Sequence, residues 1–166
     1  MTPESTEGVT SLNGSNGIVT SFLGDQMYGF PILAVNDIIG PHSITRVPLS
    51  PPEVAGVLNL RGRIVTAIDM RRRFGKPASE AEGEKSSISM VVIVDGEWYS
   101  LLFDRVGEVV PVSEVTIEPT PPTLRPEVAE LSHGVAKLED QLMVILDVQK
   151  ILKIGDSAGN RPDMLQ

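Results

Sequence analysis

The sequence predicts an all-β fold with a few short helices, in which one strand-rich unit occurs twice. Three observations lead to this prediction. Short apolar runs alternate with Gly and Pro through the middle of the chain, a pattern typical of β-barrels and sandwiches. Two segments repeat at fixed offsets, which indicates a duplicated architecture. Only 4% of the residues are aromatic, so Val, Ile and Leu must build the core, and branched side chains favour strands.

The longer repeat joins the segment that begins at Gly56 to the segment that begins at Gly134, 78 residues later. It pairs Leu60 with Leu138, Ile64 with Leu142, Ile68 with Leu146 and Asp69 with Asp147. A second repeat, at an offset of 71, starts at Gly24 and Asp95 and pairs Tyr28 with Tyr99, Val35 with Val106 and Asp37 with Glu108. Between these blocks Pro-Glu-Val-Ala occurs at Pro52 and at Pro126, and the second occurrence has four extra residues before its glycine.

Each copy is therefore expected to contain a hairpin, a long strand, a Pro-rich turn, a short helical turn, a second hairpin and a final helical turn. We expect a tail over residues 1–16, two intertwined barrels over 17–154 (roughly 17–78 and 86–154), and a second tail over 155–166. The segment Lys76–Ser87 is the expected loop between the copies. A unit of about 65 residues buries so small a fraction of its surface that it is marginal alone, so the copies should share a core with a groove at their seam.

Turn and capping residues support these elements. Gly24-Asp25, Asp95-Gly96, Arg61-Gly62 and Glu139-Asp140 are the expected hairpin tips. Asp69 and Asp147 each follow a strand and precede a short helical run, so both are predicted N-caps that accept free backbone N–H groups. Gly75 and Gly155 are plausible helix stops.

The composition excludes several classes of function. A formal charge of −8 disfavours nucleic acid or an anionic membrane as partner. The chain has no cysteine, and its two histidines, His42 and His133, are both read as surface turn residues. Phosphate-binding and nucleophile motifs are not found, so we expect no catalytic residue, no metal and no cofactor. The N-terminal sequence lacks a signal peptide and no apolar run could span a bilayer, so a soluble, cytoplasmic protein is expected.

Arg61 is the strongest candidate for binding. It is expected at a hairpin tip beside Gly62, within an apolar sequence, where a planar guanidinium can make directional contacts to carboxylates or carbonyls. The alternative is a simple exposed turn residue. For Arg71 to Arg73, a solvated basic face is as plausible as a binding role.

The block Gly56-Val-Leu-Asn-Leu-Arg-Gly-Arg-Ile-Val resembles the CheW family of chemotaxis coupling proteins. That family carries Asn-Leu-Arg-Gly followed by a strand that ends in Asp and an arginine-bearing turn, found here at Asn59 to Gly62, Asp69 and Arg71. The resemblance covers about residues 17–152. Two positions depart from the family pattern, with Asp37 where Glu is common and Thr66 where Pro is common.

The resemblance implies two five-stranded SH3-like β-barrel subdomains and a non-catalytic adaptor. Such proteins link the cytoplasmic helical hairpin of chemoreceptors to the regulatory SH3-like domain of the histidine kinase CheA, and ring or array assembly with the kinase becomes an expectation. Transferred by position, the partner-binding residues are Val35, Asp37, Gly56, Asn59, Arg61, Gly62 and Ile64.

Two alternatives to this function remain open. The first is a CheW-like adaptor of a parallel sensory kinase that controls motility, pili or a surface structure. The second is a small-barrel hydrolase that uses its carboxylates, which requires Asp69 or Asp147 to line a pocket instead of capping a helix.

Overall fold

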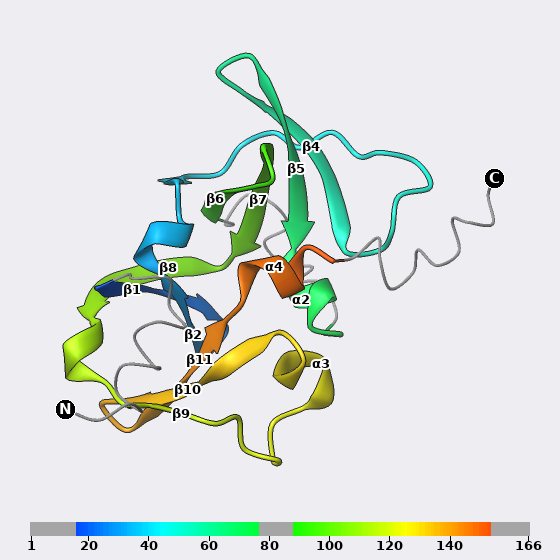
Figure 1. The fold of residues 1–166 in the computed structure, drawn as a ribbon. Helices are drawn as coiled ribbons and strands as arrows, with labels where there is room; N and C mark the ends of the chain where they lie inside the picture. The colour runs from blue at the N-terminus through cyan, green and yellow to red at the C-terminus, as the bar shows by residue number, and fades with distance from the viewer. Residues whose placement is uncertain (1–15, 77–87, 154–166) are drawn as a thin grey trace.

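The computed structural model describes residues 16–76 and 88–153, and two β-sheets dominate it (Figure 1). The six-stranded sheet has the order β8 (Arg105–Pro111), β1 (Gly17–Leu23), β2 (Gln26–Pro31), β11 (Gln141–Leu146), β10 (Ser132–Leu138), β9 (Ile117–Glu118). The five-stranded sheet has the order β3 (Asp37–Ile39), β6 (Ile88–Val94), β7 (Glu97–Phe103), β5 (Arg63–Asp69), β4 (Val54–Leu60). The prediction of an all-β fold with two subdomains is confirmed.

Among the described residues, helical structure is confined to single turns. These are η1 (Ile32–Ala34), α2 (Met70–Arg73), η3 (Val112–Glu114), α3 (Pro126–Ala129) and α4 (Val148–Ile151). Within the part of the chain that the structure describes, no helix is long and apolar enough to cross a membrane.

The duplication is visible in the order of the strands. Strands β3, β6, β7, β5 and β4 occupy the same places in their sheet as β8, β1, β2, β11 and β10 in theirs. The sixth strand, β9, pairs with Val135 and Ala136 of β10, and its counterpart is a single bridge between Thr45 and Val57 of β4. One sheet therefore has six strands and not the expected five, because only one copy extends this bridge into a two-residue strand.

The two sheets do not coincide with the sequence copies 17–78 and 86–154. The hairpin β1–β2 of the first copy lies in the sheet of β8–β11, and the hairpin β6–β7 of the second copy lies in the sheet of β3–β5. The two hairpins are thus exchanged between the copies, and each pairs with a strand of the other copy in a parallel ladder. Tyr28 lies opposite Val144 in one ladder, and Tyr99 lies opposite Thr66 in the other. Each sheet is therefore completed by strands from both copies.

Three buried clusters match this arrangement. The five-stranded sheet encloses one around Leu58, Val65 and Val91. The six-stranded sheet encloses another around Ile18 and Met143. The largest cluster draws residues from both sheets and from α2, α3 and α4, so the expected shared core is present.

The expected hairpin tips occur where the sequence placed them. Each tip has residues with positive φ, for example Asp95 at 53° and Gly96 at 80°, as tight two-residue turns require. Three other expectations are wrong. Pro52 and Glu53 form a turn that leads directly into β4, where a helical turn was expected. In the first copy, η1 and the short β3 replace the long strand expected after the first hairpin. His133 lies in β10 and not in a turn.

Candidate partner-binding surfaces

Five of the seven predicted partner-binding residues gather at one end of the five-stranded sheet. We call this the β4–β5 tip surface, made of Asp37, Asn59, Arg61, Gly62 and Ile64. The tip is a tight turn in which Arg61 has φ 56° and Gly62 has φ 83°. The Gly62 N–H donates to Oδ1 of Asn59 over 2.9 Å, which holds the turn and so fixes where Arg61 leaves the backbone.

An ion pair closes the sheet at this end. Nη2 of Arg61 lies 3.5 Å from Oδ2 of Asp37, although β3 and β4 are opposite edges of the sheet. The Arg61 side chain is 75% exposed, so the pair contributes little to stability. Its effect is to orient an accessible guanidinium.

Apolar side chains accompany this pair. Ile64 stands opposite Asn59 in the β4–β5 ladder and is 63% exposed, and Ile38, next to Asp37, is 42% exposed. Exposed isoleucines beside an oriented arginine form the mixed surface typical of a protein interface.

The corresponding end of the six-stranded sheet has different charges. Glu108 and Glu139 occupy the positions of Asp37 and Arg61, and an open pocket of about 420 Å³ lies beside them. Leu142 and Val109, the counterparts of Ile64 and Ile38, are also partly exposed. The two ends thus share an apolar framework, but only the β4–β5 tip surface carries an arginine at its turn.

Gly56 does not lie on the tip surface. It is buried, with φ 148°, and a Cβ at this position would lie 2.2 Å from the carbonyl oxygen of Thr45. Gly56 can therefore affect a partner only indirectly, by allowing the Thr45 backbone to pair with β4.

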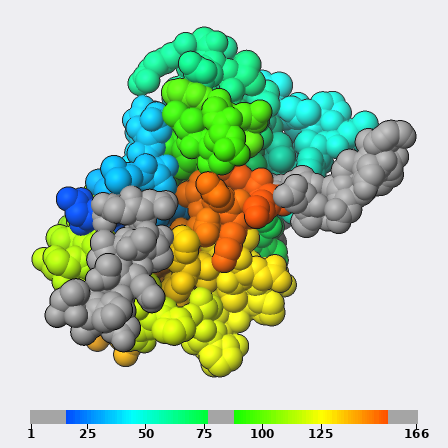
Figure 2. Space-filling model, in the orientation of Figure 1, coloured from blue at the N-terminus to red at the C-terminus, as the bar shows by residue number. Residues whose placement is uncertain are grey.

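Val35 lies in a separate pocket between the sheets, which we call the seam pocket. Its volume is about 370 Å³, and η1, β6, β10, β11 and α4 contribute to its wall. Among its lining residues, Leu33 is 69% exposed and Ile93 is 41% exposed, whereas Val35 is partly buried against the shared core. Figure 2 shows this face, with the orange α4 segment against the green β6–β7 segment.

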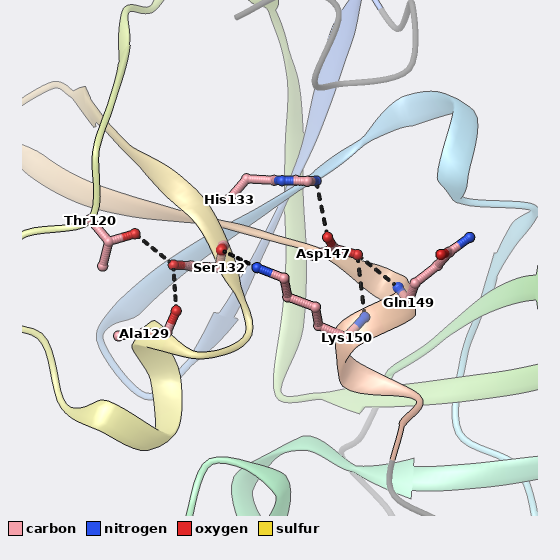
Figure 3. A network of polar contacts seen from close by, with 7 residues as sticks. All are labelled: Thr120, Ala129, Ser132, His133, Asp147, Gln149 and Lys150. Carbon is pink, nitrogen blue, oxygen red and sulfur yellow. Dashed lines mark hydrogen bonds and ion pairs between the residues drawn. The ribbon is translucent and has the colours of Figure 1, made fainter. Parts of the chain in front are cut away.

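The carboxylates of Asp69 and Asp147 cap helices. Oδ1 of Asp69 accepts the backbone N–H groups of Arg71 and Arg72, and Oδ1 of Asp147 accepts those of Gln149 and Lys150. Asp147 also lines the seam pocket, where its Oδ2 lies 3.5 Å from Nε2 of His133 (Figure 3).

These contacts limit the chemistry of the seam pocket. Lys150 directs its ammonium group to the carbonyl of Ser132 at 3.5 Å, so the polar groups around Asp147 are engaged with one another (Figure 3). Among the described residues no group of three or more His, Asp or Glu side chains is placed to hold a metal ion. The geometry suits docking of a partner.

Sequence reasoning missed Leu33, Ile38, Ile93 and His133. For Ile38, the internal repeat gave a signal, because the offset of 71 pairs it with another branched apolar residue, Val109, and the structure shows both exposed. His133 was misplaced because Gly134 was read as a turn residue. Gly134 instead lies at a β-bulge in β10, where a Cβ would lie 2.5 Å from the carbonyl oxygen of Glu118.

Comparisons with known proteins agree with the resemblance seen in the sequence. The model of the CheW-like domain matches residues 17–155. The chemotaxis protein CheW of Helicobacter pylori is 36% identical over 131 residues, which are 79% of this chain and 78% of that protein. The chemotaxis protein CheW of Treponema pallidum is 28% identical over 81% of this chain and 80% of that protein. The crystal structure of the scaffolding protein TtCheW from Thermoanaerobacter tengcongensis superposes with a TM-score of 0.73 at 31% identity, covering 84% of this chain and 89% of that one. The chain belongs to the family of CheW-like domains.

Proposed function

We propose that this protein is a non-catalytic chemotaxis adaptor that couples the cytoplasmic tip of a chemoreceptor to a histidine kinase of the CheA type. One observation carries the proposal: the chain presents two surfaces lined by different residues, the β4–β5 tip surface and the seam pocket, one for each of two partners. Physical coupling of two proteins requires such a pair of surfaces. In this role the adaptor acts in the cytoplasm, is recruited to receptor arrays at the membrane, and joins the kinase in rings or larger arrays.

The tip surface is the proposed kinase site. The regulatory domain of such a kinase is itself a small SH3-like barrel, and a turn with a fixed arginine flanked by isoleucines suits a contact between two barrels. The ion pair between Arg61 and Asp37 holds the guanidinium in position before binding, which lowers the entropic cost of the contact.

The seam pocket is the proposed receptor site. Its exposed Leu33 and Ile93, with Val35 at its wall, offer apolar anchors for one face of an amphipathic helix. Signalling then requires that the receptor's states bind this pocket with different free energies, because equal binding shifts no equilibrium.

The alternatives are less well supported. Two relatives named as chemotaxis proteins favour the chemotaxis pathway over a parallel sensory kinase. A hydrolase would need a free carboxylate, whereas Oδ1 of Asp69 and Oδ1 of Asp147 both accept backbone N–H groups.

The two assignments are tested by charge reversal. We expect Arg61→Glu to raise the Kd for the kinase regulatory domain about tenfold or more. The new carboxylate would lie beside Asp37, and the interface would bury two negative charges without a cation. Binding of a receptor hairpin fragment should change less than about twofold. Isothermal titration calorimetry with each purified partner measures both values.

Two further variants complete the experiment. Lys137→Glu is the matched control, since it makes the same charge change at an exposed strand position of the other sheet and should leave both affinities unchanged. Leu33→Asp should show the opposite pattern, with loss of receptor binding only. If Arg61→Glu binds the kinase domain as tightly as the unaltered protein, the assignment of the tip surface is wrong.

A further inference from the structure

The internal duplication provides two corresponding sites, one covered by α3 and one open, and the covered site indicates which kind of segment the open one can bind. On the first of two corresponding sites, α3 covers a surface made by the β1–β2 hairpin and α2. Val128 of α3 is 4% exposed and belongs to the same buried cluster as Leu23, Tyr28 and Phe74. Tyr28 and Phe74 stack there with their ring centroids 4.9 Å apart.

The beginning of α3 lies over the end of α2. A Cβ at Gly75 would lie 3.3 Å from Nη2 of Arg125 and 3.4 Å from Cγ of Glu127. The covering segment reads Arg125-Pro126-Glu127-Val128, with Arg125 as the N-cap and Pro126 in the first helical turn. An arginine, a helix-starting proline and an aliphatic residue three positions after the arginine therefore form the cover.

The second site of the pair is open. We call it the α4 pocket, with a volume of about 340 Å³, lined by Val94, Asp95, Glu97, Tyr99, Gln149, Leu152 and Lys153. Each lining residue is the repeat counterpart of a residue at or beside the covered site, namely Leu23, Gly24, Gln26, Tyr28, Arg71, Phe74 and Gly75 in the same order.

The residues of the covered site are more deeply buried than their counterparts in the α4 pocket. Leu23, Tyr28 and Phe74 are at most 3% exposed, whereas Val94, Tyr99 and Leu152 are only partly buried. The reason is local to the first copy, in which Pro-Glu-Val-Ala lacks the four residues that separate it from the glycine in the second copy, so that Val54 and Ala55 already belong to β4 and no counterpart of α3 forms. Within residues 16–76 and 88–153, no segment takes the place of α3 over the α4 pocket.

The sequence contains a second segment of the same kind. Arg161-Pro162-Asp163-Met164 repeats the pattern of Arg125-Pro126-Glu127-Val128, with an arginine, a proline, an acid and an apolar residue. These residues lie outside the described ranges, but the described chain ends at Lys153, which itself lines the α4 pocket. Seven residues separate Lys153 from Arg161, and the eight steps along the chain can span about 26 Å when extended, more than enough to return to the pocket.

We propose that residues 161–164 occupy the α4 pocket, as the segment Arg125 to Val128 covers the corresponding site. Met164 provides the apolar side chain for Tyr99 and Leu152. A flexible methionine suits this site, because Leu152 stands where the covered site has Phe74, so the stacked pair of Tyr28 and Phe74 has no equivalent here. Asp163 matches Glu127, which lies beside Gly75, and the counterpart of Gly75 in the α4 pocket is Lys153, so the acid of the motif meets a cation there. Asp95 and Glu97 also line the pocket and offer carboxylates to Arg161. Pro162 matches Pro126, which begins α3.

The docked segment borders the seam pocket, because Val94 and Gln149 line both pockets. The inference stands on the internal template and not on the proposed receptor or kinase contacts.

The test uses paramagnetic NMR on the full chain. Because the sequence has no cysteine, Gln166→Cys provides a single site for a nitroxide label. We expect the label to broaden the amide signals of Glu97, Tyr99 and Leu152 selectively, and Met164→Asp in the same labelled chain to abolish this broadening. Ala158→Asp is the matched control, since it adds the same charge outside the motif and should leave the broadening in place.

Three outcomes would overturn the proposal. The first is broadening that is spread evenly over the surface or centred away from the α4 pocket, and the second is broadening that survives Met164→Asp. The third comes from a mixture of isotope-labelled chain without nitroxide and unlabelled chain with it. Equal broadening at the pocket in that mixture would place the segment on a second copy and not on its own chain.

Discussion

Two glycines at equivalent positions show how single residues shape both sheets. Gly56 and Gly134 each lie at a β-bulge, and each allows a carbonyl oxygen, of Thr45 or of Glu118, to approach where a Cβ would stand. The family resemblance singled out Gly56 as a partner-binding residue, but sequence alone could not show that it is buried. The approaching carbonyl comes from the separate segment between β3 and β4, and such long-range proximity leaves no local pattern.

Replacing Gly56 should therefore destabilise the fold severely. We expect Gly56→Ala to lower the free energy of unfolding by about 3 kcal/mol or more, because it adds a backbone collision to a strained φ. Urea denaturation followed by Trp98 fluorescence measures the change. Gly96→Ala is the control, since its φ is 80° but its Cβ would meet open space, and it should cost only about 1 kcal/mol. Equal losses in the two variants would contradict the role of the Thr45 contact.

The buried tyrosine at the centre of the shared core gives a second prediction for a single residue. Burial raises the pKa of Tyr28 from 10.0 to about 12, and Arg125 and Arg71 only partly oppose this effect. Since the folded pKa lies above the unfolded one, Tyr28 stabilises the fold fully below pH 10, and this contribution is lost between pH 10 and 12. At pH 11 we expect the protein to have lost about 1.4 kcal/mol that Tyr28→Phe retains. Denaturation curves of both proteins at pH 8 and pH 11 measure the difference, and parallel losses would show that Tyr28 is not the group concerned.

Among the elements, those fixed by local chemistry were predictable and those fixed by long-range pairing were not. The hairpin tips, for instance at Asp95-Gly96, and the caps at Asp69 and Asp147 depend on neighbouring residues, and they occur where the sequence placed them. The exchange of hairpins between copies depends on which strand lies beside Tyr28 or Tyr99. A repeat in the sequence is compatible with either choice, so only the structure reveals it.

The two capped helical turns are joined by an arginine. Nε of Arg73 donates to the carbonyl of Ile151 over 2.8 Å, and Nη2 donates to that of Lys150 over 3.2 Å. Arg73 and Ile151 are counterparts in the repeat, so the contact links α2 and α4 at the same point of each copy. The sequence left a solvated basic face and a binding role equally open for Arg71 to Arg73, whereas the structure gives Arg73 a defined place between the copies.

This link should be measurable. We expect Arg73→Ala to lower the free energy of unfolding by about 1.5–3 kcal/mol, because two charged hydrogen bonds to backbone carbonyls are lost. Arg72→Ala is the control, since Arg72 is 46% exposed and only pairs with Asp69 at 3.6 Å, and its loss should stay below about 0.5 kcal/mol. Urea denaturation compares the two variants. A similar small loss in both would mean that the Arg73 contacts contribute nothing beyond a surface pair.

At the scale of the whole molecule, the exchanged hairpins make the two sheets depend on each other. Pulling the copies apart would break both parallel ladders, β2–β11 and β5–β7, and would open the largest buried cluster, to which both sheets contribute. The sequence predicted a shared core from size alone, because a unit of about 65 residues is marginal by itself. The exchange gives a stronger reason, since neither copy contains a complete sheet.

Thermal unfolding should accordingly be a single cooperative transition. Two barrels joined only by a linker would each unfold at a temperature of its own, whereas here neither sheet can persist once the other has released the hairpin that it shares. We expect differential scanning calorimetry to give one peak, with calorimetric and van't Hoff enthalpies that agree. The variant Gly56→Ala provides the decisive comparison, because it strains only the five-stranded sheet. It should shift the whole peak to lower temperature, and a second transition left at the original temperature would show that the six-stranded sheet is stable without its neighbour.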